Sequence, residues 1–213
     1  MVSQTQGCPH WYKRFFSWAL ANGNAEYEHA IADRKRSLLA DLRGDVLEIG
    51  PGTGVNLPYY ATDIHWIGIE PNPFMHPYLR KEAKKQGLNI DLRSGTAERL
   101  EVKDNSVDAV VSTLVLCSVP NLRGTLQEIL RVLKPGGRFV FIEHVAAAQG
   151  TWLRQIQHTV QPVWKLIGDG CCPDRETGKA LDQAGFASVN YQHFEGPFPI
   201  PIVKPHIAGV ATK

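Results

Sequence analysis

One short stretch constrains the fold of this chain more than any other part of its sequence. Residues 46–54 read VLEIGPGTG, an apolar run followed directly by three glycines at alternate positions. Glycines in this pattern allow a tight turn and let a ligand lie against main-chain N–H groups at the start of a helix. The stretch therefore predicts a β-strand, then a ligand-binding loop, then a helix from about residue 54.

Three kinds of ligand compete for such a loop. A phosphate-binding loop ends in Gly-Lys followed by Ser or Thr, and no such pair follows Gly54. A dinucleotide-binding loop has its third glycine where this chain has Val55. The remaining pattern places the Glu48 carboxylate beside the glycines, where it would repel a pyrophosphate but suit the ammonium group of a methionine tail. A glycine-rich turn that binds no ligand is the alternative.

Apolar runs alternate with helical patterns along the rest of the chain. The runs that predict strands are 45–50, 65–69, 88–93, 107–113, 138–145, 187–194 and 203–211. The segments that predict helices are 26–43, 54–60, 73–86, 121–133, 151–167 and 174–184. This alternation indicates an α/β domain with a parallel sheet. The last two strands have only a short connection, so they must be antiparallel.

Length and composition are those of one globular domain. We expect 213 residues to form a single unit, with an N-terminal helical lid at 1–43, a cofactor-binding core at 44–145 and substrate-side helices and a hairpin at 146–213. A net charge of +2 gives no strong attraction for nucleic acid. The four cysteines lack the paired spacing of a zinc site, so we expect no metal and a reducing compartment. No apolar run is long enough to span a bilayer, which favours a cytoplasmic location.

Further candidates follow the other strands, at the edge where parallel sheets bind their ligands. Glu70 ends the second strand twenty residues after Gly50, where a carboxylate can accept both hydroxyls of a ribose. A solvated surface carboxylate is the other interpretation of Glu70. The turn after the third strand could present Ala97 and Glu98 to the edge of an adenine. The backbone at Thr113 and Leu114 should line the same groove.

Together, residues 45–145 resemble the class I S-adenosylmethionine-dependent methyltransferases, including the LKPGG turn at 133–137. The resemblance implies a Rossmann-like fold with a seven-stranded, mostly parallel sheet, a C-terminal antiparallel hairpin and helices on both faces. It also implies S-adenosyl-L-methionine as the cofactor. Its binding residues would be Glu48, Gly50, Pro51, Gly52, Thr53, Gly54, Glu70, Pro71, Thr96, Ala97, Glu98, Thr113 and Leu114.

Four segments carry a narrower resemblance. They are TLVLCSV at 113–119, EHVAA at 143–147, DGC at 169–171 and VKPHI at 203–207. These look like the alkyl thiol S-methyltransferases of animal endoplasmic reticulum and lipid droplets, which methylate hydrogen sulfide and small thiols. The resemblance implies S-methylation of a small apolar thiol. Those relatives begin with a hydrophobic membrane anchor that this sequence does not show, and they have Cys at the position of Pro51 and Asp at that of Glu70.

Other functions remain open at this point. The acceptor could be a quinone-like lipid methylated on carbon or oxygen, or a phospholipid headgroup methylated on nitrogen. A non-catalytic partner subunit that binds the cofactor is a different class of function. Its glycine loop or ribose-binding acid would be broken, and here both are intact.

Fewer residues point to the acceptor. His144 ends the fifth strand, and we expect it at the rim of the active site, where it would orient or deprotonate the acceptor. Its alternative is a structural hydrogen bond between strand and loop. Cys117 is interpreted as packing rather than as a nucleophile. The Cys171-Cys172 pair admits an arsenite-binding interpretation, although adjacent cysteines chelate one centre poorly.

Two aromatic segments lie outside the predicted core. The stretch 11–18 is aromatic and basic, and the helix at 151–167 carries apolar residues on one face. Both could cover the cofactor as an apolar lid, with Tyr12 and Trp152 touching the acceptor. The alternatives are peripheral contact of the N-terminal aromatic segment with a membrane interface, and ordinary packing.

Overall fold

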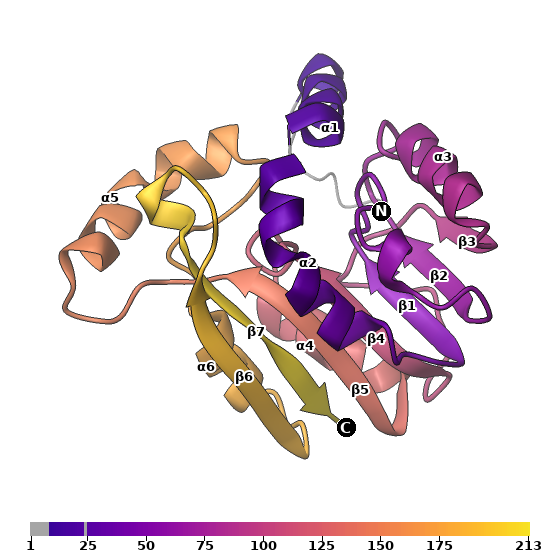
Figure 1. Ribbon diagram of the computed structural model, residues 1–213. Helices are drawn as coiled ribbons and strands as arrows, with labels where there is room; N and C mark the ends of the chain where they lie inside the picture. Colours follow the sequence, from indigo (N-terminus) through magenta and orange to yellow (C-terminus); the bar gives the residue numbers. More distant parts are fainter. Residues whose placement is uncertain (1–8, 24) are drawn as a thin grey trace, which may run out of the picture.

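The computed structural model describes residues 9–23 and 25–213, and its elements form three layers, with helices on both faces of a central sheet (Figure 1). The strands are β1 (Asp45–Ile49), β2 (His65–Ile69), β3 (Ile90–Arg93), β4 (Val107–Thr113), β5 (Leu133–His144), β6 (Ser188–Glu195) and β7 (Pro205–Thr212). The α-helices are α1 (His10–Gly23), α2 (Ala25–Leu39), α3 (His76–Gln86), α4 (Leu122–Val132), α5 (Trp152–Ile167) and α6 (Thr177–Asp182). Two short 3₁₀ helices are η1 (Leu57–Tyr59) and η2 (Pro201–Val203).

The strands are hydrogen-bonded in the order β3-β2-β1-β4-β5-β7-β6. β1 to β5 are parallel to one another, whereas β7 is antiparallel to both β5 and β6. This confirms the Rossmann-like sheet with a C-terminal antiparallel hairpin. Because the strands are parallel, the carboxyl ends of β1 to β5 meet at one edge, and the loops that leave them lie together.

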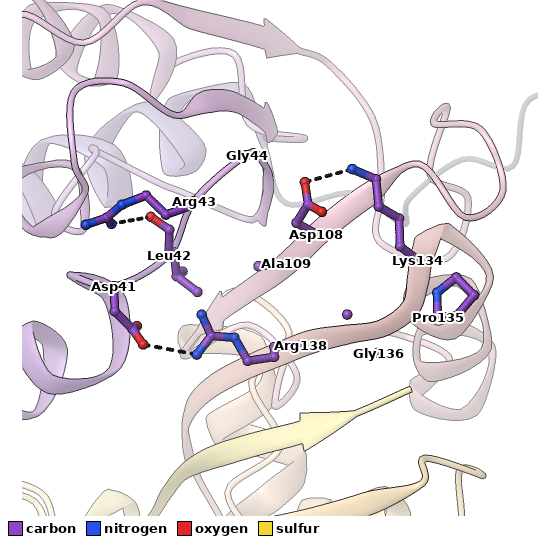
Figure 2. A pocket seen from close by; sticks show the side chains of 11 residues that line it. Asp41, Leu42, Arg43, Gly44, Asp108, Ala109, Lys134, Pro135, Gly136 and Arg138 are labelled. Carbon is purple, nitrogen blue, oxygen red and sulfur yellow. Dashed lines mark hydrogen bonds and ion pairs between the residues drawn. The ribbon is translucent and has the colours of Figure 1, made fainter.

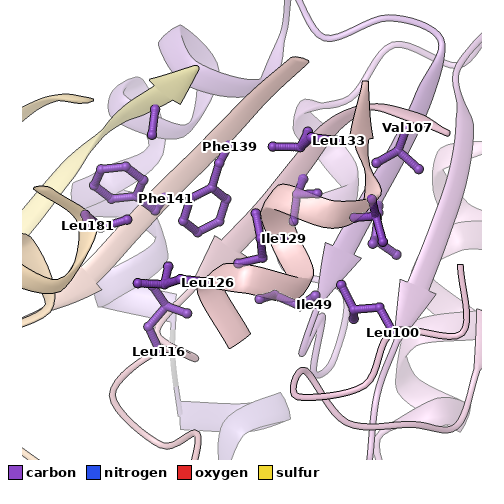
Figure 3. Packing of buried hydrophobic residues seen from close by; sticks show 14 of the residues in the cluster. Ile49, Leu100, Val107, Leu116, Leu126, Ile129, Leu133, Phe139, Phe141 and Leu181 are labelled. Carbon is purple, nitrogen blue, oxygen red and sulfur yellow. The ribbon is translucent and has the colours of Figure 1, made fainter. Parts of the chain in front are cut away.

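Both faces of the sheet are buried, which explains its almost continuous apolar strands. Phe139 and Phe141 of β5 pack with residues of α4 and α6 on one face (Figure 3). Val140, between them, belongs to the cluster on the other face, which includes residues of α2 and α3. Alternate residues of an extended strand point to opposite faces, so this one strand supplies both cores.

Local sequence signals set several helix ends. The Asn121 side chain accepts the N–H of Gly124 at 3.0 Å and caps α4. Thr151 caps α5 in the same way through the N–H of Arg154 at 3.3 Å. α3 ends at Gly87, whose φ of +67° is the left-handed conformation that terminates many helices.

The helix predicted at 54–60 is wrong. The segment forms turns, with only the 3₁₀ helix η1 within it. Pro58 lacks the N–H that a longer helix needs. The side chains of Asn56 and Tyr60 also turn inward, where both donate to the Glu48 carboxylate.

Other boundaries also differ from the prediction. β5 begins at Leu133 instead of residue 138, because Leu133 pairs with Val107 before a register shift in the ladder. One helix was predicted at 26–43, but α2 ends at Leu39 and the separate helix α1 precedes it. α6 is shorter than the predicted 174–184. Within residues 9–23 and 25–213, no helix combines the length and apolar character needed to cross a bilayer.

Candidate active site

The predicted cofactor residues lie on the loops at the carboxyl edge of β1 to β4, below helix α1 (Figure 1). The Asn72 side chain, on the loop after β2, donates to the Ser17 hydroxyl of α1 at 3.1 Å. The Tyr12 hydroxyl donates to the carbonyl of Ile167, the last residue of α5, at 2.5 Å. α1 is thus bonded to a loop on one side of this edge and to the end of α5 on the other.

The glycine loop leaves open space at only one of its three glycines. All three have positive φ, at +58° for Gly50, +56° for Gly52 and +88° for Gly54. A Cβ would lie 2.6 Å from Val115 at Gly50 and 3.1 Å from Leu57 at Gly54. At Gly52 it would meet no atom of the described chain within 4 Å. Gly52 therefore allows a ligand to approach the backbone.

The N–H groups of the three glycines are already paired, contrary to expectation. Gly50 donates to the carbonyl of Ile69 at 2.9 Å, and Gly54 to that of Pro51 at 2.9 Å. Gly52 donates to the Glu70 carboxylate at 2.9 Å. Because no α-helix follows the loop either, it lacks the helix dipole that a phosphate site uses, and its three glycines offer no free donor. The geometry suits a ligand that approaches the backbone closely at Gly52 and carries no phosphate group at this loop.

Glu48 lies beneath the loop and is 2% exposed. Its carboxylate accepts from the Asn56 amide at 2.8 Å, the Tyr60 hydroxyl at 2.8 Å and the Trp66 indole at 3.1 Å. Burial raises its pKa, and these three donors oppose the shift. The structure thus makes Glu48 an anchor for the loop, bonded to the buried Asn56 side chain.

Glu70 joins the loops that follow β1 and β2. One carboxylate oxygen accepts the N–H of Gly52, and the other accepts that of Asn72 at 2.7 Å. Burial raises the pKa of Glu70 from 4.5 to about 7, with the nearby Asp169 acting in the same direction. The interpretation of Glu70 as a solvated surface residue is therefore wrong.

The turn after β3 holds a buried hydrogen-bond acceptor. Thr96, Ala97 and Glu98 are half-buried in a short turn closed by the N–H of Arg99 donating to the Thr96 carbonyl at 3.3 Å. Oε1 of Glu98 is buried, and the described residues offer it no hydrogen-bond partner. A buried acceptor without a donor is costly, and such exceptions often mark a missing ligand or water.

The loop after β4 is shaped by a residue that the sequence analysis did not single out. The buried carboxylate of Glu143, in β5, accepts the N–H groups of Val115 and Leu116, each at 3.1 Å. Leu114 adopts a positive φ of +57° just before them, and the Thr113 hydroxyl accepts from Asn56 at 3.0 Å. The signal for Glu143 was an acid inside the otherwise apolar end of β5.

The other predicted cofactor residues lie on the same loops but differ in exposure. Pro51 is buried, Thr53 is half-buried and Pro71 is exposed.

His144 is buried rather than at a rim, with 4% of its surface exposed. Its Nε2 lies 2.9 Å from Sγ of Cys171, on the loop after α5. This matches the alternative interpretation, a histidine bonded between strand and loop. A hydrogen bond from the Cys117 thiol lowers the pKa of Cys171, with help from His144 and Trp164, while Cys117 has a raised pKa.

The structure does not bring Tyr12 and Trp152 together. Tyr12 contacts the last residue of α5, whereas Trp152 is the first residue of that helix and is exposed. A helix rises about 1.5 Å per residue, so the two ends of α5 are roughly 22 Å apart. One small acceptor cannot contact both side chains in this conformation.

A pocket at the opposite end of the sheet is not part of this site (Figure 2). It lies where β1, β4 and β5 begin. Its walls are held by ion pairs of Lys134 with Asp108 at 2.8 Å and of Arg138 with Asp41 at 3.2 Å. Parallel sheets bind ligands at the other edge, so we assign this pocket no function.

The residues at the carboxyl edge fit S-adenosylmethionine. Gly52 leaves room for close approach, the buried Glu70 carboxylate lies beside it at the end of β2, and Oε1 of Glu98 has no partner among the described residues. Residues 47–141 match the family described as a methyltransferase domain. A S-adenosylmethionine-dependent methyltransferase from Aquifex aeolicus has the same fold, with a TM-score of 0.64 at 18% identity, covering 93% of this chain and 97% of that one. The chain is a S-adenosylmethionine-dependent methyltransferase.

Two human proteins are similar to the chain over nearly its whole length. The thiol S-methyltransferases TMT1A and TMT1B are 38% and 36% identical to it over 212 residues, which cover 94% of this chain and 87% of each relative. The chain belongs to the thiol S-methyltransferase family.

Proposed function

We propose that this enzyme transfers the methyl group of S-adenosylmethionine to the sulfur of a small apolar thiol. The similarity to the human thiol S-methyltransferases carries the proposal, because it extends beyond the cofactor-binding core to residues 146–213. Methyltransferases that share only the core would be similar over residues 47–141 alone.

In this proposal the cofactor is held by groups at the carboxyl edge. Glu70 accepts the ribose hydroxyls, Glu98 accepts from the adenine amino group, and Gly52 allows the ligand to lie against the loop. Asn56 and the loop anchored by Glu48 face the methionine tail. When bound, the cofactor supplies a methyl group on a positively charged sulfonium.

The chain's part in the reaction is to align the acceptor and exclude water. The thiol of free cysteine has a pKa near 8.5, and a thiol of similar acidity is in small part the nucleophilic thiolate at neutral pH. The positive charge of the bound sulfonium would favour that anion. We therefore assign the enzyme no general base. His144, the candidate from the sequence, faces Cys171, and its contacts give it no open path to an acceptor.

Helix α1 is the proposed lid. Its contacts with Asn72 and Ile167 place it over the edge where the cofactor residues lie. Asn72 donates to the Ser17 hydroxyl at 3.1 Å and to the Lys13 carbonyl at 3.4 Å, and neither core cluster includes a residue of α1, so α1 can open without disrupting them. Tyr12 is the α1 residue that we propose to approach the acceptor.

We also propose that α1 contacts a membrane surface peripherally. Trp11, Phe15 and Trp18 are exposed at helical spacing on one face, with Lys13 and Arg14 in the same helix. Aromatic and basic side chains of this kind are favoured at a bilayer interface. A Trp11→Ser, Phe15→Ser, Trp18→Ser variant should lose sedimentation with phosphatidylcholine vesicles and keep its cofactor affinity. Equal sedimentation of variant and wild type contradicts this proposal.

The acceptor is tested with labelled cofactor and matched substrates. An alkyl thiol, the corresponding alcohol, a quinol and phosphatidylethanolamine vesicles are each incubated with enzyme, and labelled products are identified by mass spectrometry. We expect the methyl thioether alone. Labelling of the quinol or the phospholipid without the thiol would refute the thiol proposal and leave the cofactor assignment intact.

A further inference from the structure

Three side chains capable of binding a metal ion converge near the acceptor side of the sheet. Cys117 follows β4, His144 ends β5 and Cys171 lies on the loop after α5. One ligand atom from each lies within 4.8 Å of the other two. The segments are far apart in sequence, so the fold, rather than a local motif, brings these side chains together.

The cluster is enclosed and its position is fixed by the backbone. The exposed fractions are 2% for Cys117, 4% for His144 and 9% for Cys171. The N–H of Cys172 donates to the carbonyl of Cys117 at 2.9 Å, which holds the two cysteine segments side by side. Nothing in the proposed methyl transfer uses these three side chains.

One atom of the cluster is left unsatisfied. His144 Nδ1 is buried and has no hydrogen-bond partner among the described residues. A buried nitrogen without a partner is costly, and in native proteins such groups often indicate an absent ion or water. Nε2, which lies 2.9 Å from Sγ of Cys171, is the nitrogen placed to share an ion with the cysteines, and the imidazole is held on that side only.

We propose that Cys117, His144 and Cys171 bind one soft metal ion, for which Zn²⁺ is the reference, through two thiolates and one imidazole. In a tetrahedral zinc site, Zn–S is about 2.3 Å and Zn–N about 2.0–2.1 Å, so neighbouring ligand atoms are roughly 3.6–3.8 Å apart. The cluster reaches that spacing with small side-chain movements. Three protein ligands leave a fourth position for water or a thiol.

The donor set determines the class of ion. Thiolate and imidazole ligands favour Zn²⁺ and Cu⁺, whereas Mg²⁺ and Ca²⁺ need oxygen ligands. The carboxylate next in sequence, that of Glu143, already accepts from Ser112, Val115 and Leu116. The bound ion would fix the loop of Cys171 against the ends of β4 and β5. This site does not depend on the identity of the methyl acceptor.

Cys172 provides a matched control. It is also a buried cysteine, adjacent to Cys171, but its Sγ faces the Arg175 guanidinium at 3.4 Å and the Gln161 amide at 3.6 Å. Both contacts are donors, and neither is a metal ligand. Cys172→Ser should therefore leave metal binding unchanged, whereas Cys171→Ser should weaken it.

The experiment uses reduced, chelator-treated full-length protein in a Cys8→Ser background. Co²⁺ is titrated first, and its thiolate charge-transfer and tetrahedral absorption bands are recorded before displacement by Zn²⁺. We expect one ion per chain, loss of the bands on adding Zn²⁺ but not Mg²⁺, and at least about a hundredfold weaker binding in Cys117→Ser and Cys171→Ser. Cys172→Ser should match the background protein, and thermal melts identify any variant that does not fold.

X-ray absorption of the zinc-loaded background protein gives a result that needs no folded variant. Two sulfur ligands and one imidazole are expected. The proposal is overturned if no thiolate bands appear or if the zinc shell contains no sulfur. It is also overturned if a Cys117–Cys171 disulfide survives treatment with reductant, or if Cys172→Ser weakens metal binding as much as Cys171→Ser does.

Discussion

The carboxylate of Glu70 accepts the backbone N–H of Gly52 at 2.9 Å, so the acid at the end of β2 is bonded directly to the glycine loop after β1. The same carboxylate accepts from Asn72, whose side chain contacts Ser17 of α1. One side chain therefore connects two cofactor loops, and through Asn72 the proposed lid. The residue proposed to bind the ribose also maintains the shape of the site.

Gly52 tests the cofactor site with a matched control elsewhere in the fold. Gly52 and Gly87 both have positive φ, at +56° and +67°, and a Cβ at either would meet no described atom within 4 Å. Asn tolerates this conformation best among residues with a side chain. Gly52→Asn and Gly87→Asn should lose similar stability in thermal melts, but only Gly52→Asn should lose binding of S-adenosylhomocysteine in calorimetry. If both variants bind like the wild type, the loop does not hold the cofactor.

The raised pKa of Glu70 predicts an unusual pH dependence of the free energy of unfolding. Its folded pKa of about 7 lies above the ordinary 4.5, so the folded chain binds more protons than the unfolded chain between these values. Its contribution is therefore fully present below pH 4.5 and is lost as the pH rises through about 7. A shift of this size corresponds to about 3 kcal/mol. The lowered pKa values of Cys171 and His206 act in the opposite direction over this range. The decline should therefore appear in the difference between wild type and Glu70→Gln in denaturant unfolding between pH 5 and 8, whereas the exposed Glu101→Gln should follow the wild-type profile.

Cofactor binding should follow the opposite trend. Ribose hydroxyls donate best to an ionised carboxylate, so affinity for S-adenosylhomocysteine should rise between pH 6 and 8 and level off above the pKa of Glu70. Calorimetry across this range measures the trend. If the affinity of the wild type does not change with pH, or if it still rises in Glu70→Gln, another group binds the ribose.

The sheet could be predicted because its signals are local and repeated. Strands buried on both faces read as apolar runs, and the glycine loop marks where the first strand ends. The order of the carboxyl-edge loops then follows from parallel topology, which is why Glu70 and Gly52 could be assigned to one site. The helix at 54–60 could not be judged locally, because Asn56 and Tyr60 turn toward Glu48 beneath the loop.

The cluster of Cys117, His144 and Cys171 was harder to predict for the same reason. Its residues come from three separate segments and have no ligand spacing in the sequence. Only the packed fold shows that the second cysteine of the cluster is Cys171 and that Cys172 faces Arg175 instead. Side chains that meet from distant segments leave no periodic pattern in the sequence.

A substitution of Glu98 should lower the affinity for the cofactor without lowering the stability of the fold. Its buried Oε1 has no partner in the described chain, so Glu98→Leu should leave the melting temperature unchanged or raise it. The same change should weaken S-adenosylhomocysteine binding roughly ten- to hundredfold, the usual loss for a hydrogen bond to a charged group. The inosine analogue, which lacks the amino group, should bind wild type and variant equally. A lower melting temperature with unchanged affinity would make Glu98 a structural residue.

The last prediction concerns the state in which the acceptor reacts. If no enzyme group removes its proton, kcat/KM should follow the thiolate fraction and level off near the pKa of the thiol itself. Ethanethiol and its trifluoro analogue are close in shape but differ in pKa, so the plateau should begin at a lower pH for the fluorinated thiol. The plateau rate should be lower for that thiol, because intrinsic nucleophilicity falls with pKa. Cofactor must be saturating at every pH, since Glu70 titrates near 7 and would otherwise add its own inflection. An inflection at the same pH for both thiols would belong to the enzyme and would show that a protein group takes the proton.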